Sequence, residues 1–417
     1  MSGIELAPSA ARLTSSLRDI GYDLESAIAD LVDNSVTAGA RHVSVRLEFD
    51  ERDSWICIAD DGLGMSKAEL VEGLRFGTRR TYTEGELGRF GLGLKTASIS
   101  QCRRVTAFSR RSLQRRWISG FTLDLDHIEA CDRWELLRAP NDRFSMLAAQ
   151  LLDRRPGTVV FWNQLDRVID LAKPGSGWNR RRLDVQANRI RQHLGMVFHR
   201  FLEQTVPSRP PLVISVNGVR AEPWNPFAPL EQTDQLSNVV FDVGDGSQVA
   251  LGRYVLPARH EFSSPSEFER LGGPNKWNRQ QGFYVYRANR LIQSGGWCGL
   301  RAADEHTKLA RASLDFPTTV DSEFKIDVSK MRVSIPARIK SLLSDPIAEL
   351  VAGADRRYRR KDPRPTPSVA PTKGTGTGEV GAQLVVAALE EGLTHKLDRI
   401  MKRLGVNDPD IASGLGW

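Results

Sequence analysis

An acid and an amide stand four residues apart in the segment Leu24 to Ala40, LESAIADLVDNSVTAGA. Its apolar residues recur at helical spacing, with Asp23 as the expected cap of the first turn and Gly39 as the expected end. On such a helix Asp30 and Asn34 are stacked neighbours at one edge of the apolar stripe. A carboxylate and an amide held there can face a pocket. The alternative is the ordinary solvated edge of an amphipathic helix.

A second acidic position follows a predicted strand. The segment HVSVRLEF alternates apolar and polar residues, and SWICIAD follows it after a charged turn, so together they predict a hairpin. The second strand runs into DDGLGM, where Gly62 and Gly64 allow the backbone to approach a flat ligand closely. The carboxylate of Asp60, at the strand end, can accept a hydrogen bond from an exocyclic amine. The alternative is an acidic glycine turn that binds nothing.

A glycine-rich segment before a helix is the third candidate. Gly88, Gly91 and Gly93 precede a helix-forming run that contains Lys95 and Thr96. Backbone N–H groups of such a loop can converge on a phosphate at the helix N-terminus. The pattern is not the G-x-x-x-x-G-K-[ST] of a P-loop, and no strand of a dinucleotide-binding fold precedes it. The polar, flexible segment just before it suits a mobile lid.

These residues need a sheet and helices to position them. The apolar run Gly157–Trp162 predicts a buried strand with Thr158 near its start. Ser66 predicts the N-cap of a helix that ends near Leu74, with Glu69 completing a capping box. A long amphipathic pattern over about 181–204 predicts the helix that closes this first unit.

Four blocks in a fixed order resemble the GHKL superfamily, named for gyrase B, the heat-shock chaperone ATPase, histidine kinases and MutL. They are D-x-x-x-N on a helix, D-x-G-x-G after a strand, G-x-x-G-x-G-x-K before a helix and a later G-T on a strand. In the second half, GFYVYRANRLI followed by IDVSKMRVSIP resembles the transducer domain of MutL, gyrase B and MORC proteins. The prokaryotic MORC-like and MutL-like branch is the most similar, and the resemblance extends over about residues 10–340.

The resemblance implies a role for each matching residue. Asn34 would hold Mg²⁺, Asp60 would read the adenine amine with support from Thr158, and Lys330 would reach back to the γ-phosphate. The remaining residues would line the base or wrap the phosphates as the lid closes: Gly62, Gly64, Met65, Gly88, Gly91, Gly93, Lys95 and Thr96. ATP and Mg²⁺ are therefore the expected ligands.

Asp30 departs from the family pattern, which usually has glutamate as the residue that orients and deprotonates the attacking water. Aspartate has the same chemistry with one methylene less reach, and a small displacement of a base can lower the rate by orders of magnitude. Asp33 is turned away on the helix and cannot substitute. We expect Asp30 and Lys330 to serve hydrolysis and the ATPase to be slow. The alternative is a non-hydrolysing nucleotide-dependent switch or a chaperone-like scaffold.

The expected fold class is α+β. We expect a Bergerat-fold α/β sandwich, a mixed sheet with helices on one face, followed by a ribosomal-protein-like α/β transducer domain and a helical C-terminal tail. The expected parts are an ATP-binding domain over 1–205, a transducer domain over 206–338, a basic helix over 339–361, a flexible linker over 362–380 and a C-terminal helix and tail over 381–417. The first boundary rests on Pro207, Pro210 and Pro211.

Composition limits the class of protein and its partners. The 417 residues carry a net charge of +7, which favours anionic partners. The four cysteines are too scattered to indicate a disulfide framework or a zinc site. No apolar run is long enough for a membrane span and the N-terminus does not resemble a signal peptide, so a cytoplasmic location is expected.

The expected partners follow from charge and from the resemblance. Arginine clusters near 103–104, 110–111, 115–116, 179–182 and 356–360 favour DNA, with solvated surface as the alternative. The resemblance implies a homodimer that forms on ATP binding and acts as a gate or clamp, with DNA or with a nuclease, repair or defence protein. A C-terminal amphipathic helix over about 383–404 is a candidate docking element for a partner protein. A histidine kinase is disfavoured, because no helical hairpin with a phospho-accepting histidine precedes these blocks.

Overall fold

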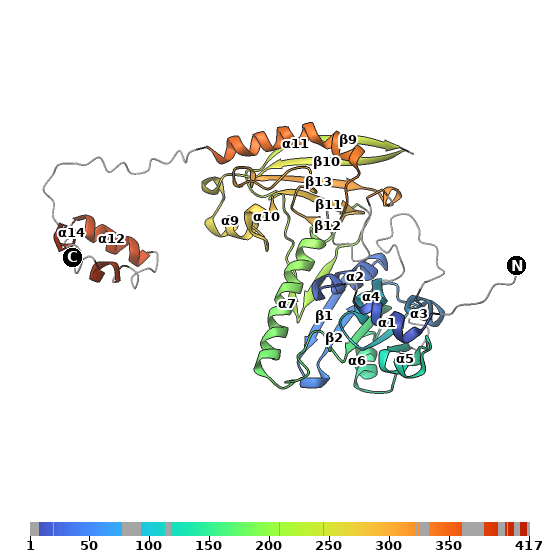
Figure 1. The fold of residues 1–417 in the computed structure, drawn as a ribbon. Helices are drawn as coiled ribbons and strands as arrows, with labels where there is room; N and C mark the ends of the chain where they lie inside the picture. The colour runs from blue at the N-terminus through green and yellow to red at the C-terminus, as the bar shows by residue number, and fades with distance from the viewer. Residues whose placement is uncertain are drawn as a thin grey trace. The chain divides into compact units, whose positions relative to one another are not determined.

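The computed structural model describes residues 8–19, 21–76, 93–112, 118–207, 209–244, 246–321, 323–324, 333–360, 379–390, 397, 399–403 and 409–414. The chain divides into two compact units, residues 1–360 and 361–417. The first unit contains two β-sheets with the helices that cover them (Figure 1).

The first sheet has eight strands in the order β5-β4-β3-β6-β2-β1-β7-β8. Its strands are β1 (His42–Glu48), β2 (Trp55–Asp60), β3 (Arg104–Arg110), β4 (Ser119–Asp124), β5 (Leu137–Arg138), β6 (Gly157–Asn163), β7 (Val213–Val216) and β8 (Val219–Arg220). β1 pairs in parallel with β7, and the other neighbours pair antiparallel. The sheet is therefore mixed, as the sequence predicts.

Both faces of the first sheet are covered by apolar side chains. Successive residues of a strand point to opposite faces, so one strand contributes to two clusters. In β6, Val160 and Trp162 belong to the main core, whereas Val159 and Phe161 belong to a smaller one. The helices around this sheet are α1 (Ala10–Arg18), α2 (Leu24–Thr37), α3 (Lys67–Leu74), α4 (Gly93–Ile99), α5 (Leu125–Cys131), α6 (Arg143–Leu151), α7 (Gly177–Val197) and α8 (His199–Leu202). Ala148 of α6 lies in the smaller core, so α6 adds cover on the face opposite to the main helical layer.

The predicted caps of two helices are confirmed. The side chain of Asp23 accepts a hydrogen bond from the backbone N–H of Ser26 at 2.7 Å, which starts α2, and Gly39 follows its end with φ at +72°. At α3, the Ser66 hydroxyl and the Glu69 carboxylate each accept a backbone N–H from the other residue, at 3.3 and 2.8 Å. These local signals fix where α2 and α3 begin.

The second sheet has five strands in the order β12-β11-β13-β10-β9. Its strands are β9 (Asp234–Gly244), β10 (Ser247–Val255), β11 (Gly282–Arg287), β12 (Arg290–Ser294) and β13 (Ala310–Phe316). The α-helices of this part are α9 (Pro265–Leu271), α10 (Lys276–Gln280) and α11 (Ala337–Tyr358). Three short 3-10 helices also belong to it: η2 (Arg259–Glu261), η3 (Glu305–Thr307) and η4 (Thr318–Val320). A further 3-10 helix, η1 (Glu51–Asp53), lies between β1 and β2 of the first sheet. The apolar stripe of α11 packs into the core of this sheet, so the basic helix expected from 339 is part of the same layered structure (Figure 1).

The change from one sheet to the other comes later than the sequence suggests. The three prolines after 206 do end the helical segment, but β7 and β8 follow them and extend the first sheet. Residues up to Arg220 therefore belong with the first sheet, because β7 pairs with β1 over His42–Val45. A strand partner distant in sequence decides the boundary, and the local proline signal cannot reveal it.

The two sheets meet at the end of α7 and at α8. In β11, Tyr284 and Tyr286 point away from the α11 side and form a separate cluster with Met196. The Tyr286 hydroxyl lies 2.8 Å from Nε2 of His199, and the guanidinium of Arg200 lies 3.5 Å from the centroid of the same ring. Because side chains alternate along β11, one face of the second sheet packs against α11 and the other packs against the end of α7 and α8.

The second unit contains α12 (Glu379–Glu390) and α14 (Pro409–Gly414). The helix expected over 383–404 corresponds in part to α12, and residues 391–396 lie outside the described residues. Among the described helices, not one has the length and apolar content needed to traverse a bilayer.

Candidate functional site

Asp60, at the end of β2, is held by donors from three segments. One oxygen accepts the hydroxyl of Ser35 on α2 at 2.9 Å, and the other accepts the backbone N–H groups of Gly62 at 3.0 Å and Thr158 at 3.3 Å. Burial raises the pKa of Asp60 above its usual value, and these hydrogen bonds oppose the rise. These contacts fix the orientation of the half-buried Asp60 carboxylate at the C-terminal end of β2, a central strand of the sheet.

Thr158 contacts Asp60 through its backbone, while its side chain has a different partner. The Thr158 hydroxyl lies 2.9 Å from the hydroxyl of Ser109 on β3, and Ser109 also accepts the backbone N–H of Met65 at 2.7 Å. Ser109 therefore ties the loop after β2 to β6. No sequence signal marks Ser109, because its position opposite Thr158 depends on the pairing of β3 with β6.

The two glycines after Asp60 are needed for close contacts with other parts of the protein. Gly64 has φ at +64°, and a Cβ there would lie 2.0 Å from the carbonyl oxygen of Arg110. A Cβ at Gly62 would lie 2.8 Å from that of Ala38. The loop is therefore packed closely onto β3 and the end of α2.

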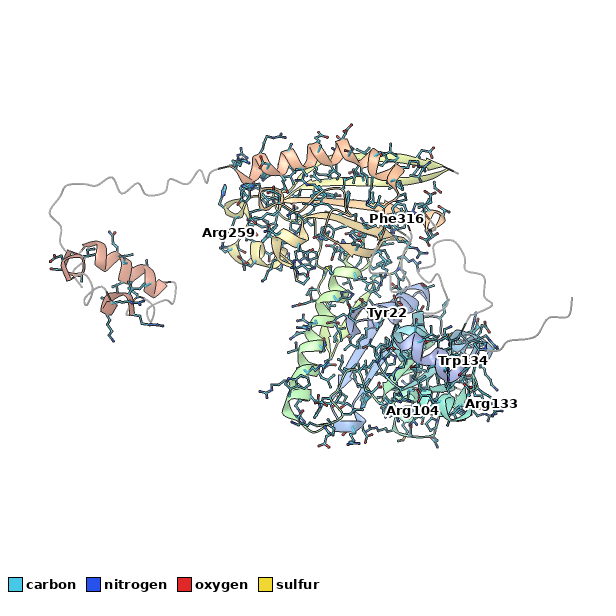
Figure 2. All side chains as sticks on the ribbon, in the orientation of Figure 1. Tyr22, Arg104, Arg133, Trp134, Arg259 and Phe316 are labelled. Atoms are coloured by element: carbon cyan, nitrogen blue, oxygen red, sulfur yellow. The ribbon has the colours of Figure 1, made fainter. Side chains whose placement is uncertain are left out.

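Asp30 and Asn34 occupy different environments on α2. Asp30 is only 2% exposed, and one of its oxygens accepts the hydroxyl of Tyr22, labelled in Figure 2, at 2.9 Å. Asn34, one turn later, is exposed. A Cβ at Gly93 would lie 3.4 Å from the same oxygen of Asp30, so the acid is next to the start of α4. The structure thus brings the first block and the end of the glycine-rich block together.

Arg290 is a second contact of Asp30 that the sequence did not indicate. Its Nη2 lies 3.5 Å from Asp30 Oδ1, and its Nε donates to Asp33 Oδ1 at 2.9 Å. Asp33, turned away from the expected pocket, is thus a buried partner of an arginine on the second sheet. A separation of 257 residues leaves no local pattern from which this contact could be predicted.

The expected phosphate-binding residues of α4 face protein in this structure. Lys95 is 2% exposed and donates to the carbonyl oxygen of Arg75 at 2.5 Å; burial lowers its pKa to about 8, with Glu72 opposing the shift. Thr96 is buried and hydrogen-bonds to Tyr22. The remaining expected residues lie outside the described residues: Gly88, Gly91 and Lys330.

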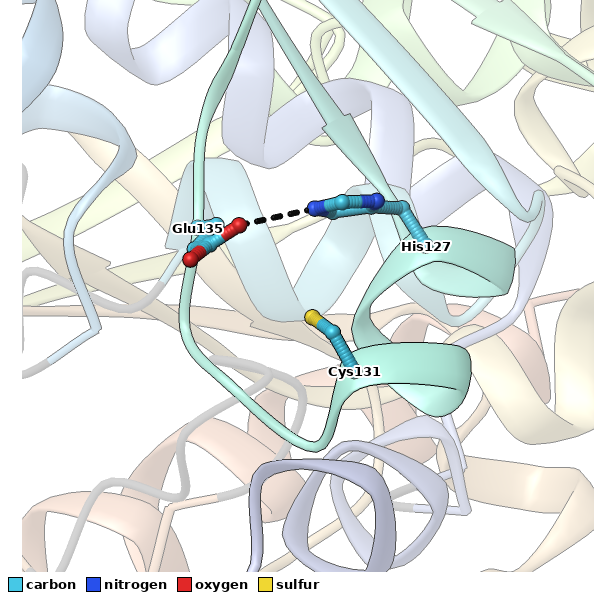
Figure 3. Close-up of side chains that lie close together, drawn as sticks. All are labelled: His127, Cys131 and Glu135. Carbon is cyan, nitrogen blue, oxygen red and sulfur yellow. Dashed lines mark hydrogen bonds and ion pairs between the residues drawn. The ribbon is translucent and has the colours of Figure 1, made fainter.

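A separate group of potential metal ligands lies on α5 and the segment after it. Figure 3 shows His127 and Cys131 on the helix and Glu135 beyond it. Their potential ligand atoms lie within 4.8 Å of one another. His127 Nε2 lies 2.9 Å from a Glu135 oxygen, and Arg133 lies 3.0 Å from the other. These contacts account for the arrangement without an ion.

A cleft of about 360 Å³ lies at the N-terminal end of α2, away from Asp60 and Asn34. Its lining includes Arg18 and Arg167, which pair with Asp166 and Asp19. Among the described residues, its lining includes none that belong to the four sequence blocks.

This part of the chain is similar to the ATPase domains of the GHKL superfamily. Residues 22–158 match the family model of histidine kinase-, DNA gyrase B- and HSP90-like ATPases, which confirms the resemblance inferred from the four blocks. Over 86 residues, 21% of this chain, the sequence is 31% identical to the ATPase morc-1 of Caenorhabditis elegans. The aligned part spans only 10% of that relative's length. Both similarities support ATP binding and ATPase activity in general.

Proposed function

We propose that this protein binds ATP with Mg²⁺ and hydrolyses it slowly. The observation that carries the proposal is the acceptor capacity of Asp60. An ionised carboxylate offers about four acceptor positions, and protein donors at Asp60 take three: Ser35, Gly62 and Thr158. The remaining position on a rigidly held oxygen suits the exocyclic amine of adenine.

The residues of α2 suit the phosphate end of the nucleotide. Asn34 is exposed one turn beyond Asp30, and its amide oxygen is a ligand type that Mg²⁺ accepts together with phosphate oxygens and water. Asp30 would act as the base for the attacking water. Its short side chain and its burial against Tyr22 support slow turnover.

The wider mechanism extends this proposal to the whole chain. ATP would close the 77–85 segment as a lid and promote a homodimer that works as a gate or clamp. The second sheet would act as the transducer, with Lys330 at the γ-phosphate, and the arginine clusters would contact DNA or a partner nuclease, repair or defence protein. The name of the morc-1 relative supports the ATPase part of this mechanism.

The second candidate is a switch that binds ATP without hydrolysing it, or a chaperone-like scaffold. One observation favours it: Asp30, already shorter than the usual glutamate, is 2% exposed and has both Tyr22 and Arg290 as partners. An acid so enclosed is a poor base unless its surroundings rearrange.

Steady-state ATP turnover with Mg²⁺, with and without DNA, separates the two candidates. We expect Asp30→Asn to lower kcat by at least ~100-fold while the affinity for Mg-ATP stays within a few-fold, because the amide has nearly the same shape as the carboxylate but cannot act as a base. Asp153→Asn, at a side chain 65% exposed, is the matched control and should leave both unchanged. Equal turnover in Asp30→Asn and the unmodified protein would exclude Asp30 as the base. Tight Mg-ATP binding without turnover in either protein would establish the switch.

A further inference from the structure

A histidine, a cysteine and a glutamate meet beside α5, outside the four sequence blocks. His127 and Cys131 stand one helical turn apart on α5, and Glu135 follows the helix by four residues. Figure 3 shows the three side chains directed toward one another, and their potential ligand atoms all lie within 4.8 Å of one another. Imidazole nitrogen, thiolate sulfur and carboxylate oxygen are the ligand atoms with which proteins bind Zn²⁺.

The turn after α5 brings Glu135 back to the helix. Asp132 ends α5 with φ at +50°, a left-handed conformation that reverses the chain. Its carboxylate accepts the hydroxyl of Ser9, the N-cap of α1, at 2.8 Å. Beyond it, the ring centroid of Trp134 lies 4.6 Å from that of Phe76. The position of Glu135 is therefore fixed by contacts that its own carboxylate does not make.

The two oxygens of Glu135 have separate partners. Oε2 lies 2.9 Å from Nε2 of His127, and Oε1 lies 3.0 Å from Nη2 of Arg133. Arg133 thus orients the carboxylate from outside and leaves the oxygen beside His127 for an ion, as outer contacts of metal ligands do. These two contacts hold the arrangement without an ion, so the ligand atoms are already gathered before one binds.

The spacing and charge of this set fit a zinc ion. Bonds of about 2.0 to 2.3 Å in a tetrahedral site place their ligand atoms about 3.3 to 3.8 Å apart. Side-chain movements on the order of 1 Å would bring the present separations to this geometry. A thiolate and a carboxylate together neutralise a divalent ion, and a neutral imidazole adds no charge. The side chains of His127 and Glu135 are 33% and 38% exposed, so an ion can reach them from solvent.

The ligand types disfavour ions that prefer oxygen. Mg²⁺ and Ca²⁺ take oxygen ligands, and Glu135 is the one carboxylate of this group. The neighbouring acids Asp126 and Glu129 on α5 pair with Arg103, at 2.7 and 2.6 Å. Their charge is thus offset by a cation already. A site with one thiol, one imidazole and one carboxylate selects zinc instead.

We propose that His127, Cys131 and Glu135 bind one Zn²⁺ ion, with water as the fourth ligand. The thiol proton of Cys131 would leave for solvent, and His127 would carry its remaining proton on Nδ1 while Nε2 binds the ion. The ion would fasten the turn after α5 to the helix. That turn leads into β5, the edge strand of the first sheet, and contacts the start of α1 through Asp132. The site would therefore stabilise this side of the sheet without any part in nucleotide binding.

Calorimetric titration of the full chain with zinc is the first test, after removal of metals with a chelator and in a phosphine reductant. We expect Cys131→Ser and Glu135→Gln to weaken the binding of one equivalent by about tenfold or more. Cys298→Ser and His306→Ala are the controls and should bind as the unmodified protein does. The first removes another partly exposed thiol, and the second removes a histidine that also faces a carboxylate, Asp304, at 3.1 Å.

Cobalt identifies the ligand directly, because a thiolate bound to Co²⁺ gives a charge-transfer absorption. We expect this band in the unmodified protein and in His306→Ala, and its loss in Cys131→Ser. No stoichiometric zinc binding by the unmodified protein would overturn the proposal. Equal zinc affinity in Cys131→Ser and the controls would overturn it as well.

Thermal unfolding distinguishes the loss of a metal ligand from damage to the fold. An ion that binds the folded chain raises Tm as its concentration exceeds Kd. We expect zinc to raise the Tm of the unmodified protein and of both controls, but not that of Cys131→Ser or Glu135→Gln. In chelator, Glu135→Gln should unfold within a few degrees of the unmodified protein, because its side chain is partly exposed. An equal rise of Tm in Cys131→Ser would contradict the site.

Discussion

At the scale of single residues, the adjacent acids Asp60 and Asp61 have different hydrogen-bond partners. Asp60 accepts hydrogen bonds from α2, from β6 and from its own loop. Asp61 accepts the backbone N–H groups of Arg41 and His42, both at 2.8 Å, and so fixes the start of β1. The chemistry of the side chains is identical, and only their hydrogen-bond partners distinguish the proposed binding residue Asp60 from the structural residue Asp61.

This pair makes a matched test of the nucleotide site. We expect Asp60→Asn to weaken ATP binding by about 10- to 100-fold, because an amide cannot replace a charged acceptor at all of these contacts. Asp61→Asn should lower stability by a comparable amount and leave the affinity for ATP within a few-fold. Titration calorimetry with thermal unfolding measures both quantities. Equal losses of affinity in the two variants would remove Asp60 from the adenine site.

The sequence identifies the acids of the proposed site but not the residues that contact them. Asp30 and Asp60 stand in short local patterns, one on a helix and one after a strand, so spacing reveals them. Tyr22, Ser35 and Arg290 have no such pattern, since their contacts depend on how α2 packs against other elements. The expected phosphate contacts of Lys95 stay a prediction, because its amine donates to Arg75 in this structure.

At the scale of elements, the loop after β2 depends on a close approach of two backbones. Gly64 and Gly39 both have positive φ, +64° and +72°, but their surroundings differ. A Cβ at Gly64 would lie 2.0 Å from a carbonyl oxygen of β3, whereas a Cβ at Gly39 would meet nothing within 4 Å. Conformational strain is thus common to both, and steric overlap is confined to Gly64.

The two glycines predict unequal costs of the same substitution. Gly39→Ala should lower the free energy of unfolding by about 1 kcal/mol, from the left-handed backbone alone. Gly64→Ala should lower it by about 3 kcal/mol, because displaced backbone adds to that strain. It should also weaken ATP binding, since the loop next to Asp60 must shift. Chemical denaturation checks the stabilities, and equal values for the two variants would mean that the loop yields without strain.

Local and long-range signals differ in what they determine about the elements. The capping box of α3 and the Asp23 cap of α2 follow from a few neighbouring residues, and both were predictable. The position of α6 on the second face of the sheet was not predictable. Its apolar pattern is compatible with packing on either face, and only the contact with β6 decides which one. Helix ends therefore follow from sequence more readily than the layer to which a helix belongs.

At the scale of the whole molecule, the fold class was predictable and the division between layers was not. Alternating strands and amphipathic helices indicate an α+β chain with a mixed sheet, and the four blocks specify its first part. The end of the first sheet depends on β7, which returns after α8 to pair with β1. Pairing between distant strands is a property of the assembled chain, so three prolines gave a boundary about 15 residues too early.

The return of β7 and β8 has a consequence for making a shorter protein. A fragment that stops at residue 205 lacks both strands, which leaves one side of β1 with unpaired backbone groups and removes Ile214 and Val216 from the core. An open edge of this kind recruits other chains. We expect that fragment to aggregate and a fragment ending at residue 222 to remain monodisperse in size-exclusion chromatography with light scattering. The reverse result would show that β1 tolerates an open edge. A stable N-terminal fragment of this protein should therefore end after β8, beyond the three prolines.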